Sequence, residues 1–155
     1  MTYTQGEVSE ALLQLGQALH DSSYYARAAP FLRYALDPAS GFIYRGVLQD
    51  HCEPQSPNCI ALPTRLDVTA FKGLLVQAID DWSRTTRSNQ FSSFLRAQAA
   101  AIVGRDILGA SARAPGCRSP HTCQFGFSWA RALSPMLVTI GTQESALDGL
   151  TAVLR

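Results

Sequence analysis

The sequence has little charge. Charged residues make up 16% of its 155 residues, against roughly 25% in ordinary soluble domains, so we expect part of the surface to be covered by something other than water. Thirteen basic and twelve acidic residues leave a net charge of +1, with no block of Lys or Arg. Neither nucleic acid nor an anionic membrane is therefore indicated as a partner.

Several sequence signals are also absent. No run of 18 apolar residues occurs, which argues against a membrane-spanning helix. Residues 1–17 have no secretory signal pattern, and neither Asn58 nor Asn89 begins a glycosylation sequon. The three histidines form no H-E-x-x-H arrangement, and no Gly-x-Ser-x-Gly, P-loop or Rossmann glycine pattern is present. The sequence therefore gives no support for zinc-protease, serine-hydrolase or nucleotide-binding chemistry.

Four cysteines fall in two close pairs, Cys52 with Cys59 and Cys117 with Cys123, each flanking a loop that contains proline. A disulfide across such a loop stabilises by roughly 2–3 kcal/mol and persists in oxidising compartments. A zinc knuckle needs shorter C-x2-4-C spacing. Disulfides are thus favoured over zinc or free thiols, and they predict an extracellular protein. Because no secretory signal precedes them, we expect the beginning of the protein to be missing here.

Helical spacing of apolar residues recurs along the chain. It predicts five helices, over residues 4–19, 24–36, 67–83, 88–108 and 142–154. Short joints within the first two pairs predict two antiparallel hairpins followed by a single helix. The two intervening loops hold the cysteines. The predicted fold class is therefore all-α, with two disulfide-stapled loops.

The first predicted helix has two readable features. Thr4-Gln-Gly-Glu7 has the pattern of a capping box. Its apolar stripe is expected to face the core and consists of Val8, Ala11, Leu12, Leu15 and Leu19.

The first, third and fifth helices all begin with polar, charged or glycine-containing sequence. In a toroid of alternating inner and outer helices, these starts would meet at one central mouth.

The same helix starts resemble those of one enzyme family. Tyr3-Thr-Gln-Gly6 resembles the start of an inner helix in glycoside hydrolase family 76, the endo-α-1,6-mannanases. Phe71-Lys-Gly73, with Asp67 and the first cysteine pair before it, is similar to the fungal cell-wall branch of that family. Cys123-x-x-Gly126-x-x-Trp129 resembles a spread form of its Cys-Gly-x-x-Trp element, and residues 141–147 are similar to its terminal helix. The elements occur in the family order across most of the chain.

The resemblance implies a fold and an activity. Residues 1–155 would be the C-terminal part of a single (α/α)6 barrel domain, a partial toroid of about five helices whose N-terminal part is absent. The parent would be a secreted or cell-wall mannan endo-1,6-α-mannosidase or transglycosidase. Its partners would be α-mannan or other mannose-containing glycans, and it would need no metal or organic cofactor. Membrane association would require an anchor that this chain does not contain.

Family members act through two adjacent aspartates, and a retaining mechanism places such carboxyl groups about 5–5.5 Å apart. The tempting match is Asp80-Asp81-Trp82, but it lies towards the C-terminal end of its helix, away from the proposed mouth. Neighbours on a helix also diverge by about 100°. We expect Asp80 and Asp81 to be a solvated helix end and Trp82 to lie in the core. The chain would then hold no catalytic residue and be inactive alone.

Five residues near the starts of the expected inner helices are candidates for sugar binding. They are Gln5, Asp67, Phe71, Lys72 and Gln143. Amides and charges can hydrogen-bond sugar hydroxyls, and an aromatic ring can stack on a pyranose face. The alternatives are that Asp67 caps its helix, that Lys72 is a surface charge and that Phe71 belongs to the core.

Two other functions remain open. The chain could be a stand-alone helical carbohydrate-binding or interaction module that kept half of the barrel's groove, without catalysis. It could also be a helical adaptor with no role in sugar binding. Hydrolysis and glycosyl transfer are equally compatible with the sequence.

We predict that both cysteine pairs are local disulfides, because each is close in sequence and encloses a turn-forming proline. Non-reducing peptide mapping of natively secreted protein should recover Cys52 linked to Cys59 and Cys117 linked to Cys123. Links between the two loops, or four thiols open to alkylation, would refute the prediction.

Overall fold

The computed structural model describes residues 1–50, 53, 69–106, 125–126, 128–130 and 139–154. Its helices are α1 (Thr2–Leu19), α2 (Ser23–Leu36), α4 (Phe71–Thr86), α5 (Ser92–Ala101) and α6 (Ile140–Thr151). Shorter elements are a 3-10 turn (Pro38–Ser40), the hairpin of β1 (Ile43–Tyr44) and β2 (Val47–Leu48), and a π-helical turn (Ile102–Asp106) after α5. The prediction of a mostly helical domain with five helices is confirmed. All four cysteines and Asp67 lie outside the described residues.

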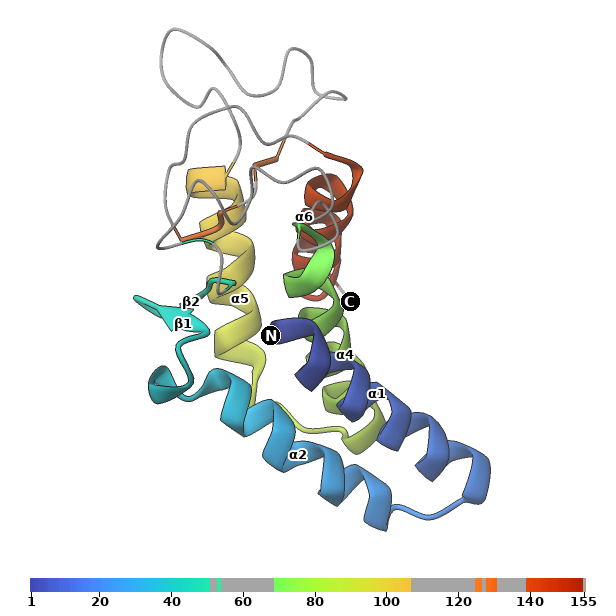
Figure 1. Cartoon of the computed structure of the whole chain (residues 1–155). Helices are drawn as coiled ribbons and strands as arrows, with labels where there is room; N and C mark the ends of the chain where they lie inside the picture. Colours follow the sequence, from blue (N-terminus) through green and yellow to red (C-terminus); the bar gives the residue numbers. More distant parts are fainter. Residues whose placement is uncertain (51–52, 54–68, 107–124, 127, 131–138, 155) are drawn as a thin grey trace, which may run out of the picture.

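Helices α1, α4 and α6 lie side by side and run in the same direction, and we call them the parallel layer (Figure 1). The direction follows from paired positions along the helices. Gly6 of α1 lies against Leu74 of α4 near both helix starts. The start of α4 likewise meets α6, where the Gly73 amide donates to Ser145 Oγ at 2.9 Å. Helices α2 and α5 run back in the opposite direction (Figure 1).

Two glycines permit the close contact between the helices of this layer. A Cβ on Gly6 would lie 2.9 Å from the Leu74 carbonyl oxygen, and one on Gly73 would lie 2.8 Å from the Ser145 Cα. Real side chains do not pack this closely against backbone atoms. Gly6 and Gly73 lie near the starts of consecutive layer helices, so a glycine permits close helix packing at both interfaces.

The core lies between the parallel layer and the two antiparallel helices. Its fully buried members include Leu13 of α1, Leu32 of α2 and Ile79 of α4. Trp82 anchors the α4 end of this core: its indole N–H donates to the Tyr25 carbonyl at 2.9 Å, and its ring centroid lies 5.2 Å from that of Phe91. Trp82 is therefore a core residue, as expected.

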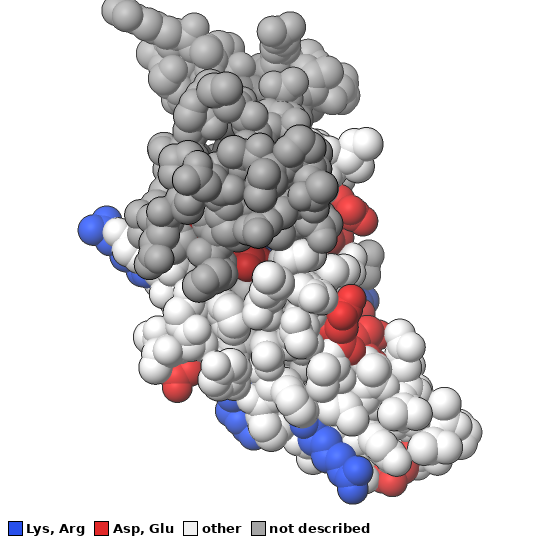
Figure 2. All heavy atoms as spheres, in the orientation of Figure 1, with Lys and Arg blue, Asp and Glu red and all other residues white. Residues whose placement is uncertain are grey.

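The expected apolar face of the first helix is wrong for four of its five residues, and of the stripe Leu12 alone packs against the core. Leu15 is 46% exposed and Leu19 is 58% exposed. The residues that α1 buries are mostly small, namely Thr2, Gly6, Ser9, Leu13 and Gly16. Close packing against α4 and α2 selects small side chains, so the larger apolar stripe points outward. Figure 2 shows that most of the described surface on this side carries no charge.

The predicted cap of α1 is also wrong. The helix begins at Thr2 with no side-chain cap, and the Thr2 hydroxyl instead donates to Asp50 Oδ2 at 2.6 Å. A capping box is present on α6, where Thr139 Oγ1 accepts from the Thr142 amide at 3.1 Å and Thr142 Oγ1 accepts from the Thr139 amide at 3.0 Å. Threonine replaces the usual Glu or Gln in this box.

We expect Gly73→Ala to lower the free energy of unfolding by about 1–3 kcal/mol, because the added methyl group forces α4 away from α6. Urea unfolding followed by circular dichroism measures the loss. Gly104→Ala is the matched control, since a Cβ there meets no atom within 4 Å. An equal effect of the two substitutions would show that helix approach is not the constraint at Gly73.

Candidate functional site

The starts of the three layer helices meet at one end of the molecule. Here the rings of Tyr3 (α1) and Phe71 (α4) lie with their centroids 4.2 Å apart, tilted by 37°. Phe71 is only 9% exposed. The Phe71 ring is thus part of an aromatic pair that joins the two helices, which matches the core alternative for this residue.

Lys72 is buried at this end and is not the surface charge offered as its alternative. Its Nζ forms an ion pair with Glu53 Oε1, and the two side chains are 1% and 0% exposed. The same ammonium lies 5.1 Å from the ring centroid of Trp129. Lys72 therefore links three parts of the sequence: the segment at residue 53, α4 and the segment at residue 129.

Burial raises the pKa of the Glu53 carboxyl above its ordinary value, although the nearby Lys72 ammonium opposes the shift. Glu53 Oε1 also accepts a hydrogen bond from the Asp50 amide at 2.7 Å. Asp50 in turn accepts from Thr2. The result is a buried polar network that holds the start of α1 and the start of α4 to the chain around residue 50.

Asp50 and Glu53 were not identified from the sequence. The available signal was Asp50-x-x-Glu53 beside Cys52, two carboxylates in a sequence with few charges. Nothing in that pattern reveals that Lys72 is the partner. Their burial makes the network a structural tie between segments rather than an open site for a ligand.

Gln143 and Gln5 lie in the first turns of α6 and α1. Gln143 Nε2 donates to the Phe125 carbonyl at 2.7 Å, and its Oε1 accepts from the Phe125 amide at 3.1 Å. This two-point contact fixes the Phe125 backbone against α6 as a neighbouring strand would. Gln5 is half-buried. The structure therefore brings Gln5, Phe71, Lys72 and Gln143 to one end of the layer, while Asp67 lies outside the described residues.

Asp80 and Asp81 lie elsewhere, about 13 Å further along α4 at 1.5 Å per residue. Both pair with Arg84, Asp80 Oδ2 at 3.2 Å and Asp81 through Oδ1. The expectation of a solvated helix end is right for the Asp81 side chain, which is 41% exposed, and wrong for the Asp80 side chain, which is 12% exposed. The Asp80 side chain is thus largely buried although its partner Arg84 is 46% exposed.

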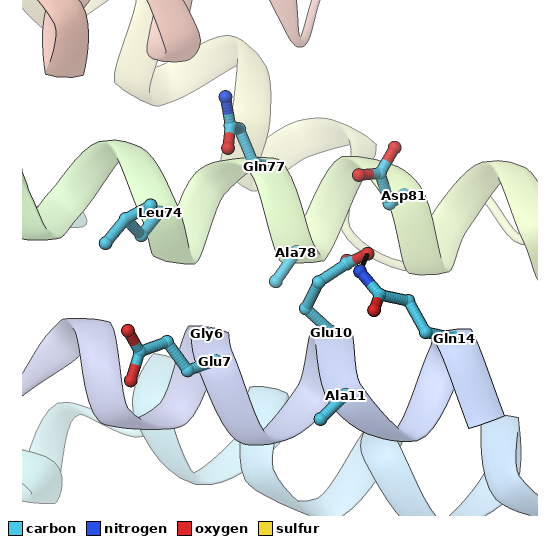
Figure 3. Close-up of a pocket in the computed structure, with 9 residues that line it drawn as sticks. All are labelled: Gly6, Glu7, Glu10, Ala11, Gln14, Leu74, Gln77, Ala78 and Asp81. Carbon is cyan, nitrogen blue, oxygen red and sulfur yellow. Dashed lines mark hydrogen bonds between the residues drawn. The ribbon is translucent and has the colours of Figure 1, made fainter.

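Two grooves follow α4 on the side away from α2 and α5. The first, of about 420 Å³, lies between α1 and α4, and Figure 3 shows its lining, which includes Glu7, Glu10 and Asp81. The second, of about 380 Å³, lies between α4 and α6 and is lined by Asp148 and Arg84 among others. Burial raises the pKa of the Asp148 carboxyl, against a hydrogen bond from Gln77. Neither groove lies at the helix starts.

Metal and membrane sites were also sought within the described ranges. No group of three His, Cys, Asp or Glu side chains there is arranged to hold a metal ion. No described helix is both long and apolar enough to cross a bilayer.

Comparison with known proteins gives one structural likeness. No protein-family model matches the sequence, and no curated protein matches it. A solved structure, the Lin0763 protein from Listeria innocua, is similar with a TM-score of 0.71 at 16% identity. The match covers 99% of this chain and 37% of that chain. At this identity the likeness shows the fold alone, and the chain spans little more than a third of the larger protein.

We predict that Lys72→Met lowers the free energy of unfolding by about 3–5 kcal/mol at neutral pH, because it leaves the buried Glu53 carboxylate without its cation. The loss should shrink as the pH falls through the folded-state pKa of Glu53, since a protonated carboxyl no longer attracts the ammonium. Urea unfolding across that pH range measures both effects.

In the wild type, the raised pKa means that protonation of Glu53 favours the folded state. Its contribution to stability is full below the ordinary carboxyl pKa and is lost as the pH rises through the folded value. The control is Lys72→Met combined with Glu53→Gln, which should recover part of the loss. A loss that is the same at every pH and in the double variant would rule out the ion pair as its cause.

Proposed function

We propose that this chain is the C-terminal portion of a secreted α-1,6-mannan glycosidase or transglycosidase of glycoside hydrolase family 76, inactive by itself. The proposal begins from the resemblance of its helix starts to that family. The parent enzyme would act on mannose-containing glycans of a cell wall by the two-carboxylate route. The catalytic pair would come from an inner helix that these 155 residues do not include.

The observation that carries the proposal is the parallel layer. Helices α1, α4 and α6 alternate with reversed helices α2 and α5, which is the arrangement expected of inner and outer helices in an (α/α)6 toroid (Figure 1). The glycines of the two family-like motifs, Gly6 and Gly73, lie at the contacts between consecutive layer helices. The likeness to a solved chain of which this one spans 37% is compatible with part of a larger array.

The position of the acidic residues supports the absence of catalysis. Asp80 and Asp81 share the Arg84 guanidinium and lie far along α4 from the helix starts. Glu53, the acidic residue whose pKa is raised at that end, is buried against Lys72. Among the described residues at the helix starts, no two carboxylates are therefore placed to act from opposite sides of a scissile bond.

A second candidate is a helical interaction module without catalysis, and one observation favours it. Two of the proposed sugar contacts, Lys72 and Gln143, already use their polar groups on Glu53 and Phe125. These two contacts stabilise the fold itself, so the two side chains need no carbohydrate ligand to satisfy their polar groups. The coding region upstream of residue 1 separates the candidates: a signal sequence and a helix with adjacent aspartates there favour the enzyme.

We expect residues 1–155, produced in an oxidising host, to release no oligosaccharide from α-1,6-mannan. Chromatography of the reaction mixture detects any oligosaccharide released from mannan. The variants Asp80→Asn and Asp81→Asn are assayed in parallel. Turnover abolished by either substitution would place the catalytic pair on α4, and turnover indifferent to both would reveal a site elsewhere. Either result would refute the inactive-fragment proposal.

A further inference from the structure

Two cavities meet at Arg84, in the last turns of α4. The first is the groove of about 380 Å³ between α4 and α6. The second, of about 280 Å³, lies between the end of α4, the start of α5 and the end of α6. Asp80, Arg84 and Ala152 line both cavities, so the two are joined. We call the joined cavity the polar trough.

We propose that the polar trough binds a neutral carbohydrate, at a site separate from the sugar contacts expected at the helix starts. Its lining combines carboxylates, hydroxyls, guanidinium groups and an amide from three helices. Members of this lining are Gln77, Arg84 and Asp148 in the first cavity and Ser83, Ser92 and Arg96 in the second. The inference goes beyond the proposed function, because it needs neither a catalytic pair nor any residue outside this chain.

Charges of both signs line the trough, and they select the class of ligand. Arg84 and Arg96 disfavour a cation. Asp80, Asp81 and Asp148 disfavour an anion. A hydroxyl group both donates and accepts hydrogen bonds. A neutral molecule with many hydroxyl groups can therefore bond to the carboxylates and to the guanidinium groups at once, which is the chemistry of a sugar.

Contacts within the protein already orient the polar groups of the first cavity. Gln77 Nε2 donates to Asp148 Oδ1 at 2.7 Å, which leaves the Gln77 carbonyl as an acceptor. Arg84 Nη2 contacts Asp80 Oδ2 at 3.2 Å and also pairs with Asp81. A guanidinium has five N–H groups, so within the described residues Arg84 keeps donors on its other nitrogens. Figure 3 shows Gln77 and Asp81 pointing away from α1. Such preorganisation lowers the entropy cost of binding.

The second cavity adds hydroxyl groups with different hydrogen-bonding roles. Ser83 Oγ donates to the Ile79 carbonyl at 2.7 Å, so its remaining capacity is to accept. Ser88 Oγ accepts from the Gln90 amide at 3.2 Å, so its own proton can be donated. Ser92 is the first residue of α5, whose start has no side-chain cap. This cavity therefore offers both donors and acceptors, as a polyhydroxylated ligand requires.

Size and apolar edges also suit a small oligosaccharide. Small-molecule sites are typically clefts of about 300–1,000 Å³ with an apolar lining and a few placed polar groups. Each cavity of the trough has an apolar edge, Leu147 in the first and Leu95 in the second. The C–H face of a sugar ring can rest on such an edge while its hydroxyl groups reach the polar side chains.

The test is a titration of the whole chain followed by amide NMR spectra. The neutral probes are α-1,6-linked mannotriose and maltotriose, and spermidine, citrate and triglycine are the cationic, anionic and zwitterionic comparisons. We expect a neutral probe to bind with a Kd of about 1 mM or below, at least about tenfold more tightly than each comparison. The amide signals that shift should be those of the trough.

Variants locate the contact. Gln77→Met and Ser92→Ala each remove a polar group from one cavity and should each weaken binding about three- to tenfold. Gln14→Met is the matched control for the first, because Gln14 is also an exposed glutamine that donates to a carboxylate, Glu10 Oε1 at 3.1 Å, and lies outside the trough. Ser93→Ala is the control for the second. Circular dichroism checks that each variant keeps its helices.

Three results would overturn the proposal: no binding of either neutral probe, binding of a charged or zwitterionic comparison as tight as that of the sugars, or sugar binding that Gln77→Met with Ser92→Ala leaves unchanged. Shifts confined to the helix starts, around Lys72 and Gln143, would also refute it. Binding of maltotriose without mannotriose would support the trough and count against mannan as the substrate of the parent enzyme, so the two proposals can fail separately.

Discussion

The rest of the structure depends on the close approach of three parallel helices. Gly6 and Gly73, near the starts of α1 and α4, have no side chain where each meets the neighbouring layer helix, and this permits the close approach. The approach leaves little room for large residues between the helices. Apart from Leu13, it therefore places small residues on the buried side of α1 and leaves Leu15 and Leu19 exposed, so the packing constraint itself creates the exposed apolar stripe.

The buried ion pair has a different role from the glycines. Packing holds the layer helices to each other, whereas Lys72 and Glu53 hold the layer to chain segments that lie outside any helix. A buried pair of charges adds little net stability compared with apolar residues, but it is costly to break. It therefore favours one arrangement of these segments over others that would leave a charge unpaired.

Much of the local structure could be predicted from the sequence, and little of the contact pattern could. Apolar spacing placed all five helices to within a few residues, although α5 ends early in a π-helical turn at Ile102. The same spacing misplaced the face of α1, because periodicity shows that a helix has an apolar side without showing what covers it. Of the residues predicted for the helix starts, Gln5, Phe71, Lys72 and Gln143 do lie there. Their hydrogen-bond partners could not be predicted. Lys72 pairs with Glu53 and Gln143 with Phe125, and these residues are too far apart in the sequence for any local pattern to reveal the contact.

The parallel layer also has a consequence for how the chain folds. Contacts between adjacent layer helices join residues about seventy positions apart, as in the Gly73 to Ser145 hydrogen bond, with a separation of 72, and the Gln77 to Asp148 bond, with a separation of 71. The antiparallel hairpins can form locally and early, but each layer contact must wait for a long loop to close. We therefore expect assembly of the layer, rather than helix formation, to set the folding rate.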